Sequence, residues 1–255
     1  MKLSALTWGD PQGLPVVLLH AFPLSGAMWE PQREALAGFR VIAPHLRGFG
    51  DTPLIGPWLV EHAAADVLET LSGLGIEKAV FVGLSMGGYV ALRIAEAAPE
   101  RLRALVLCDT RAEPDANENK AKRAAAMDFV RKNGVAAFAG PFLKDALADK
   151  TKLENPKAVE SLRSLASKAA PEAVLHALAA LAARPDALPG LSKITVPTAV
   201  FVGSQDKLTP LAMSETMRSR IPGAQLHVIP DAGHFSSVEN PAAFNERLVS
   251  FLKRL

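Results

Sequence analysis

The sequence has very little cysteine and no long apolar run. Its single cysteine, Cys108, excludes an internal disulfide and leaves no set of thiolates for a zinc cluster. No window approaches the roughly 18 consecutive apolar residues that a membrane helix requires. The opening residues, MKLSALTWGDPQG, lack the apolar stretch of a signal peptide. These absences predict a cytoplasmic protein, although a mature chain already freed of its signal would look the same.

An excess of charge of one sign is also missing. The chain has 28 Lys and Arg against 26 Asp and Glu, interspersed along its length. This balance gives no basis for a nucleic-acid groove or a membrane-binding patch, so neither partner is expected. With 255 residues, of which 49% are hydrophobic, the chain can bury a sizeable core and is not disordered.

Short apolar runs recur at intervals that suit strands separated by helices. They are nearly all apolar rather than alternating, as in parallel strands that are covered on both faces. The strands are expected at 15–20, 40–44, 78–84, 104–109, 198–203 and 224–229, with an antiparallel edge strand near 3–8. Helices are expected at 60–74, 87–98, 208–220 and 241–254. This alternation predicts an α/β fold with a mostly parallel sheet and helices on both faces.

One long segment, 111–190, has no convincing strand. It is rich in alanine, lysine and arginine, with helix-start signals at Asn155-Pro156 and Pro171. A crossover between parallel strands needs only a dozen or so residues, so a simple crossover is a poor explanation. We expect three or four helices that form a cap domain over a core domain made of 1–110 and 191–255.

Ser85 follows the predicted strand 78–84 directly, within Gly83-Leu84-Ser85-Met86-Gly87. The pattern G-x-S-x-G between a strand and a helix is typical of a nucleophilic serine on a sharp turn. Small residues two places before and after the serine avoid a clash there. The alternative is a glycine-rich turn with an incidental serine.

A serine hydroxyl needs a base that takes its proton, and the base needs an acidic partner. His234 lies in a loop after the last predicted strand, at the edge of the sheet where open α/β sheets bind ligands. Asp206 follows strand 198–203 at the same edge and completes the order Ser, Asp, His. Asp109, after strand 104–109, and Asp231, in the histidine loop, remain alternatives to Asp206.

Attack on a carbonyl also requires donors for the oxyanion. The backbone N–H of Met86, at the start of the helix, is one expected donor. The N–H of Phe22 is the second, in the segment His20-Ala21-Phe22-Pro23, where His20 is expected to brace the loop by side-chain hydrogen bonds.

With these residues in place, the chain resembles the α/β-hydrolase superfamily over essentially its whole length. The matching segments, in the expected order, are HAFP (20–23), LRGFGDT (46–52), GLSMGG (83–88), GSQD (203–206) and AGHF (232–235). The resemblance implies an eight-stranded, mostly parallel sheet, a helical cap after the sixth strand, and serine-ester chemistry without a cofactor or metal. Ala21 and His45 depart from the family pattern, which usually has glycine and aspartate there, and leave the geometry of the oxyanion loop open.

Within that superfamily the stretch GLSMGGYVALRIAEAAPERLRALVLCDT is most similar to small bacterial carboxylesterases and lactonases, including 3-oxoadipate enol-lactonases. The expected function is hydrolysis of a small ester or lactone through an acyl-enzyme. Cofactor-free haloperoxidases (perhydrolases) and C–C bond hydrolases share the serine and remain alternatives, as does a non-catalytic receptor. Two interpretations are open for five aromatic residues, which either line an apolar substrate pocket under the cap or belong to the core: Phe22, Trp29, Trp58, Phe138 and Phe142. Arg111 either meets a substrate carboxylate or is a solvated charge of the cap.

Overall fold

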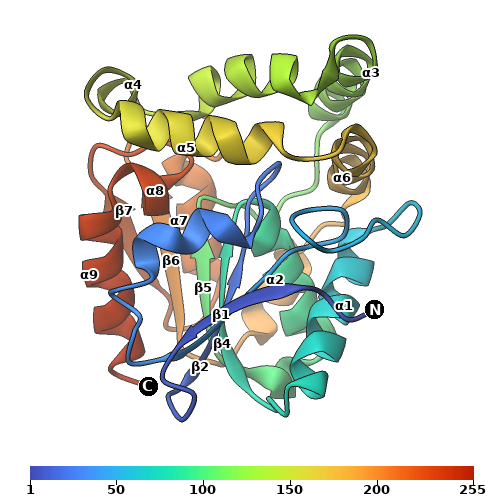
Figure 1. Cartoon of the computed structure of the whole chain (residues 1–255). Coiled ribbons are helices and arrows are strands. Elements are labelled where there is room, and N and C mark those ends of the chain that lie inside the picture. Colours follow the sequence, from blue (N-terminus) through green and yellow to red (C-terminus); the bar gives the residue numbers. More distant parts are fainter.

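A seven-stranded sheet lies at the centre of the computed structural model, which describes residues 1–255 (Figure 1). The strands are β1 (Ala5–Gly9), β2 (Pro15–Leu19), β3 (Arg40–Pro44), β4 (Ala79–Leu84), β5 (Leu102–Cys108), β6 (Thr198–Gly203) and β7 (Gln225–Ile229). Their order across the sheet is β1-β3-β2-β4-β5-β6-β7. Only β1 is antiparallel to its neighbour, as the alternating pattern near the N-terminus predicted.

The strands are apolar on both faces because the sheet separates two cores. Along β2, Val17 and Leu19 face one core, whereas Val16 and Leu18 face the other. Successive side chains of a strand point to opposite faces, so a strand that is buried on both sides reads as a continuous apolar run. All six residues of β4 and of β6 are buried.

Helices cover both faces of the sheet, as the sequence predicted. The first face packs against α1 (Val60–Gly73), α2 (Met86–Ala97) and α7 (Leu211–Arg220). The second packs against the 3₁₀ helix η1 (Gly26–Gln32), the short α8 (Ser236–Glu239) and α9 (Pro241–Leu252). Helix α9 begins at the predicted signal, because the Asn240 side chain accepts a hydrogen bond from the N–H of Ala243 and Pro241 occupies the first helical position.

Four helices follow β5 and precede β6 in the chain. In Figure 1 they lie above the ends of the strands. They are α3 (Asn117–Ala146), α4 (Asp149–Glu154), α5 (Pro156–Ser167) and α6 (Pro171–Ala183), and we call them the cap helices. A break at Gly134, where φ is +81°, divides α3 into two arms. Helices α5 and α6 begin at the two predicted proline signals. The division of the chain into a core domain and a separate cap domain, 111–190, stays a prediction. The short 3₁₀ turns η2 (Pro99–Arg101) and η3 (Leu188–Lys193) complete the chain.

The strand count differs from the eight that the family resemblance implied, and the cap helices follow the fifth strand of this sheet rather than the sixth. The residues before β1 form no further strand because they are bonded to α1. The N-terminal ammonium pairs with Asp66, and the N–H of Leu3 donates to the Thr70 hydroxyl at 2.8 Å. One antiparallel strand therefore forms this edge of the sheet.

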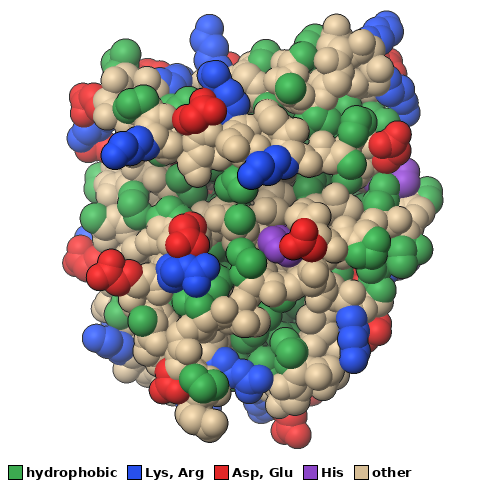
Figure 2. All heavy atoms as spheres, in the orientation of Figure 1, with side chains coloured by type: hydrophobic (Ala, Val, Ile, Leu, Met, Phe, Trp, Pro, Cys, Tyr) green, Lys and Arg blue, Asp and Glu red, His purple; other side chains and the backbone are tan.

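The face of the molecule drawn in Figure 2 carries charges of both signs without segregation. On the face drawn in Figure 2, Lys and Arg side chains alternate with Asp and Glu, including over the cap helices. This distribution agrees with the interspersed charges of the sequence. None of the helices combines the length and the apolar character that crossing a bilayer demands.

Candidate active site

Ser85 lies on a sharp turn between β4 and α2. Its φ of +52° and ψ of −110° fall in a region that side-chain-bearing residues rarely adopt. The flanking glycines allow this turn, since a Cβ on Gly83 would lie 2.4 Å from the Gly87 carbonyl oxygen. A Cβ on Gly87 would lie 2.1 Å from the carbonyl oxygen of Leu19. The glycine spacing seen in the sequence thus has a steric cause in the backbone.

Gly87→Ala is expected to lower the free energy of unfolding by about 2–3 kcal/mol, because the new methyl group meets backbone that cannot rotate away. Gly140→Ala is the matched control. Gly140 lies in α3 with open space around its Cβ position, so alanine there is expected to be stabilising by about 0.5–1 kcal/mol. Urea unfolding of both variants followed by circular dichroism measures the difference. Equal stability of the two would contradict the steric explanation.

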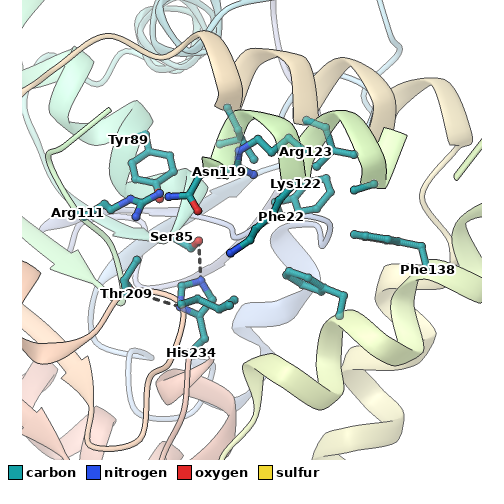
Figure 3. Close-up of a pocket in the computed structure, with 15 residues that line it drawn as sticks. Phe22, Ser85, Tyr89, Arg111, Asn119, Lys122, Arg123, Phe138, Thr209 and His234 are labelled. Carbon is teal, nitrogen blue, oxygen red and sulfur yellow. Dashed lines mark hydrogen bonds between the residues drawn. The ribbon is translucent and has the colours of Figure 1, made fainter. Parts of the chain in front are cut away.

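Three side chains from distant segments form a continuous chain of hydrogen bonds. Nε2 of His234 lies 2.8 Å from Oγ of Ser85, and Nδ1 of His234 lies 2.9 Å from Oδ2 of Asp206. Figure 3 shows His234 beside Ser85 and directed at it. The structure therefore brings together the three residues that the sequence analysis selected, in the geometry of a nucleophile, a base and an orienting acid.

The electrostatics of this chain suit proton transfer. Burial alone would lower the pKa of His234, but the Asp206 carboxylate opposite Nδ1 outweighs it, so the pKa of His234 is raised. Burial alone would raise the pKa of Asp206, but His234 and the hydrogen bonds from Thr209 lower it. Asp206 is consequently ionised at neutral pH and stabilises an imidazolium at His234.

The side chain of Asp206 is held by the residues that follow it. Its Oδ1 accepts hydrogen bonds from the backbone N–H groups of Leu208 (2.8 Å) and Thr209 (3.0 Å). The Thr209 hydroxyl donates to Oδ2 at 2.5 Å and lies 3.3 Å from Nδ1 of His234. Asp231, one of the alternative acids, is half-exposed and pairs with Lys150, so it does not reach His234.

Two backbone N–H groups are available for an oxyanion. The N–H of Phe22 has no hydrogen-bond partner in the chain, and the N–H of Met86 is the first of α2, where helix geometry leaves it without an acceptor. The Phe22–Pro23 peptide bond is cis, which the sequence did not reveal.

Two neutral histidines hold the loop that carries Phe22. Nε2 of His20 accepts the N–H of Leu46, and its Nδ1 lies 3.0 Å from the Ala21 carbonyl oxygen. Burial lowers the pKa of His20 to about 3, so this side chain stays neutral. His45 accepts the N–H of Gly26 through Nδ1. His45 thus braces the start of η1 beside this loop, and His20 braces the loop itself, as was expected of it.

A cavity of about 240 Å³ opens beside Ser85, between the edge of the sheet and the cap helices. One side is aromatic: Phe138 and Phe142 of α3 stack with ring centroids 5.5 Å apart, and both contact Phe22 edge-on. Tyr89, Leu178, Leu181 and Leu208 add to the apolar lining.

The expectation that Trp29 and Trp58 line this cavity is wrong. Trp29 is fully buried on the far side of η1, where its ring packs against Phe244 of α9. Trp58 is 3% exposed and belongs to the core between the sheet and α1. Both rings serve packing, and neither borders the cavity.

The other side of the cavity is basic. Arg111, Lys122 and Arg123 line it together with Asn119, and Figure 3 shows these side chains grouped away from Phe138. Arg111 is only 9% exposed, so it is not the solvated charge that was one of its two interpretations. Its Nη2 donates to Asp115 at 2.6 Å, whereas its buried Nε has no partner.

Asp115 is shared by three arginines, Arg111, Arg123 and Arg184, which leaves the cluster with a net positive charge. Burial alone would raise the pKa of Asp115, but hydrogen bonds and charge from Arg123 and Arg184 lower it, so the carboxylate is ionised. One carboxylate cannot balance three guanidinium groups. The basic side of the cavity can therefore receive an anion.

Sequence reasoning missed the residues that hold the loop of His234 in place. Glu239 accepts hydrogen bonds from the N–H of Phe235 (3.0 Å), the N–H of Ala148 (2.8 Å) and the hydroxyl of Thr151 (2.7 Å). The N–H of His234 itself donates to the carbonyl oxygen of Ala146 at 2.8 Å. The loop that contains His234 is thus bonded directly to the cap helices. No local motif identifies such contacts, because the partners are about 90 positions apart in the chain.

The sequence profile of the family described as alpha/beta hydrolase fold matches residues 15–241. The chain belongs to that family. The protein is therefore an α/β-fold hydrolase, in agreement with the resemblance found in its motifs.

Three individual proteins are similar to this hydrolase over more than nine-tenths of their length. It is 31% identical to 3-oxoadipate enol-lactonase 1 of Acinetobacter baylyi, over 100% of this chain and 94% of the relative. A thermophilic esterase from Thermogutta terrifontis, solved with malate bound, superposes with a TM-score of 0.94 at 39% identity and covers 99% of this chain and 93% of its own. The enol-lactonase from Burkholderia xenovorans LB400 gives 0.92 at 28% identity, over 98% and 96%.

Proposed function

We propose that this hydrolase cleaves a carboxylic ester or lactone of a small molecule through an acyl-enzyme. The observation that carries the proposal is the chain Ser85–His234–Asp206 opening onto a cavity beside two free backbone N–H groups. A cavity of about 240 Å³ suits a small substrate rather than a long polymer. The names of the similar proteins, esterase and enol-lactonase, support the same chemistry.

The first half-reaction acylates the serine. Oγ of Ser85 attacks the carbonyl carbon while Nε2 of His234 takes its proton, and the buried charge of Asp206 stabilises the imidazolium. The carbonyl electron pair moves onto oxygen, and the N–H groups of Phe22 and Met86 donate to that oxyanion. The acyl–oxygen bond then breaks, and the imidazolium gives its proton to the departing alkoxide.

The second half-reaction hydrolyses the acyl group from Ser85. His234 takes a proton from a water molecule, and the resulting hydroxide attacks the acyl carbon. A second oxyanion forms in the same place and collapses as Ser85 leaves with the proton from Nε2. No metal or cofactor has a part in either half, since the side chains and backbone groups supply each donor and acceptor.

We further propose that the substrate carries a carboxylate, which Arg111 binds. The buried Arg111 guanidinium lines the cavity, and its Nη1 has only the Met213 Sδ, a weak acceptor at 3.9 Å, so it gains a stronger partner when an anion arrives. Arginine matches the two oxygens of a carboxylate with parallel hydrogen bonds. The surplus positive charge around Asp115 favours such an anion over a neutral group.

Arg111→Gln is expected to lower kcat/KM for the anionic ester monoethyl succinate by about 10- to 100-fold, and for neutral diethyl succinate by less than about threefold. The fold should survive, because Asp115 keeps Arg123 and Arg184 as partners. Arg131→Gln, an exposed arginine of α3, is the control that alters net charge equally. Titration of released acid at constant pH measures both substrates. Equal losses for the two esters would refute the assignment of Arg111.

A panel of p-nitrophenyl esters from acetate to octanoate, extended to enol-lactones, tests the proposed function itself. Turnover is expected for short acyl chains, and acid quenching followed by mass spectrometry should find the acyl group on the peptide that contains Ser85. Absence of turnover across the panel would overturn the proposal. So would peroxide-dependent bromination or cleavage of vinylogous diketones in place of ester hydrolysis, since both point to the alternative chemistries.

A further inference from the structure

Asp109 is a buried carboxyl group beside the triad that the mechanism above does not use. It follows β5 directly, is 0% exposed, and adopts a φ of +45°. A non-glycine residue held in the left-handed region costs free energy, so the surrounding structure must hold it there. Its side chain has well-defined partners, and these partners belong to the segments that carry the catalytic groups.

The Asp109 carboxyl group joins the end of β5 to the end of β6 and to the start of α8. Oδ1 accepts the N–H of Gly203 at 2.8 Å, at the end of β6, three residues before Asp206. Oδ2 lies 2.5 Å from the hydroxyl of Ser236 and 3.3 Å from its N–H, two residues after His234. On its own strand, the neighbouring Cys108 carbonyl accepts the N–H of Ser85 at 2.9 Å.

We propose that Asp109 is a positioning residue for the triad, which fixes the segments of Asp206 and His234 to the end of β5, where the Cys108 carbonyl in turn holds the N–H of Ser85. This role depends on the proposed function in one respect, because it assumes that Ser85, His234 and Asp206 carry out the reaction. Misplacement of a catalytic side chain by about 1 Å can cost about 100-fold in rate, so a connection shared by all three segments acts directly on kcat.

Burial and neighbouring charges both act on this carboxyl group. Full burial and the nearby Asp206 carboxylate raise the pKa of Asp109, and they outweigh His234 and the hydrogen bonds from Ser236 and Gly203, which lower it. Oδ2 accepts from the Ser236 hydroxyl, and Oδ1 accepts from the N–H of Gly203. An asparagine keeps both connections, because its amide oxygen accepts from Gly203 and its NH₂ donates to the Ser236 hydroxyl oxygen once that hydroxyl has rotated. The junction therefore tolerates an amide but not the loss of its polar atoms.

The test compares Asp109→Ala, Asp109→Asn and Ser236→Ala, with Ser237→Ala as the matched control. Ser237 is as buried as Ser236, but its hydroxyl has no hydrogen-bond partner. We expect Asp109→Ala to lower kcat by about 10- to 100-fold with KM unchanged, and Ser236→Ala to lower it less. The kcat of Asp109→Asn is expected to stay within about threefold of the wild-type value. The kcat of Ser237→Ala is expected to equal the wild-type value.

Two readouts separate positioning from a general loss of folding. Active-site titration counts the competent serines, so kcat is corrected for any unfolded fraction. The rate constant at which an organophosphonate modifies Ser85 reports triad reactivity without an ester substrate, and it should fall in parallel with kcat. If no ester is turned over but this labelling shows the same ranking of variants, the proposed function fails and the role of Asp109 stands.

Wild-type rates for folded Asp109→Ala in both readouts would overturn the proposal. If that variant does not fold, Ser236→Ala decides, since rates equal to those of Ser237→Ala would show that the junction has no influence on the triad. A loss in Asp109→Asn as large as in Asp109→Ala would also overturn it, because the charge rather than the connection would then be required.

Discussion

Ser85→Ala is expected to lower kcat for p-nitrophenyl acetate by about 10⁶-fold, the scale on which removal of a triad nucleophile acts. The Oγ atom lies 2.8 Å from His234 Nε2 and cannot be replaced from elsewhere in the cavity, since no other hydroxyl lies at that distance from Nε2. KM should change little, because the aromatic and basic walls remain. Steady-state kinetics with purified variants measure both constants.

The control for Ser85→Ala is the same Ser237→Ala variant, whose serine is buried in α8 and contacts no triad atom. It should retain the wild-type rate. Removal of the Ser85 side chain also relieves no steric conflict, so the melting temperature is expected to stay near that of wild type. A Ser85→Ala variant that kept more than about a thousandth of the activity would refute the role of Ser85 as the nucleophile.

Asp206→Asn is expected to lower kcat by about 10⁴-fold. The amide NH₂ would face Nδ1 of His234, 2.9 Å away, and would stabilise the tautomer whose Nε2 carries the proton. That nitrogen could then no longer accept the proton of Ser85. Asp231→Asn is the matched control, because Asp231 lies in the histidine loop but pairs with Lys150 at the surface. It should retain activity within about twofold.

The pH profile gives this prediction a second readout. His234 must be neutral to accept a proton, so activity falls as the pH drops through its pKa. The Asp206 carboxylate overcomes the effect of burial and raises that pKa, so the acidic limb of wild-type kcat/KM is expected above pH 6.5. Without the carboxylate the pKa falls, and the limb of the residual activity should move to lower pH. A limb that stays in place would show that Asp206 does not set the charge of His234.

Much of the fold was predictable because the strands are buried on both faces. The runs that include Val80–Val82 and Ala199–Val202 read as strands from their apolar residues alone, and the structure confirms them. The glycines around Ser85 and the positions of His234 and Asp206 after successive strand ends identified the candidate triad. Parallel strands bring their carboxyl ends to one edge, so chain order alone placed these groups together.

The lining of the cavity was less predictable, since it depends on which face of a helix a side chain occupies. The sequence offers Trp29 and Phe138 equally as pocket residues, but Trp29 packs against Phe244 of α9 whereas Phe138 lines the cavity. Arg111 is buried because it pairs with Asp115, four residues later. Asp115 also pairs with Arg123 of α3 and with Arg184 at the end of α6. No pattern in the sequence encodes such contacts between distant segments.

The hydrogen bonds between the cap helices and the loop of His234 have a consequence for engineering new specificities. A cap grafted from a relative would replace Ala146, Ala148 and Thr151, and with them the partners of the His234 N–H and of Glu239. Such a chimera would gain a new pocket and disturb the placement of His234, the proposed general base. Grafts that carry 146–151 and 233–239 across as one unit would avoid this, so the exchangeable module of this hydrolase includes part of the loop that contains His234.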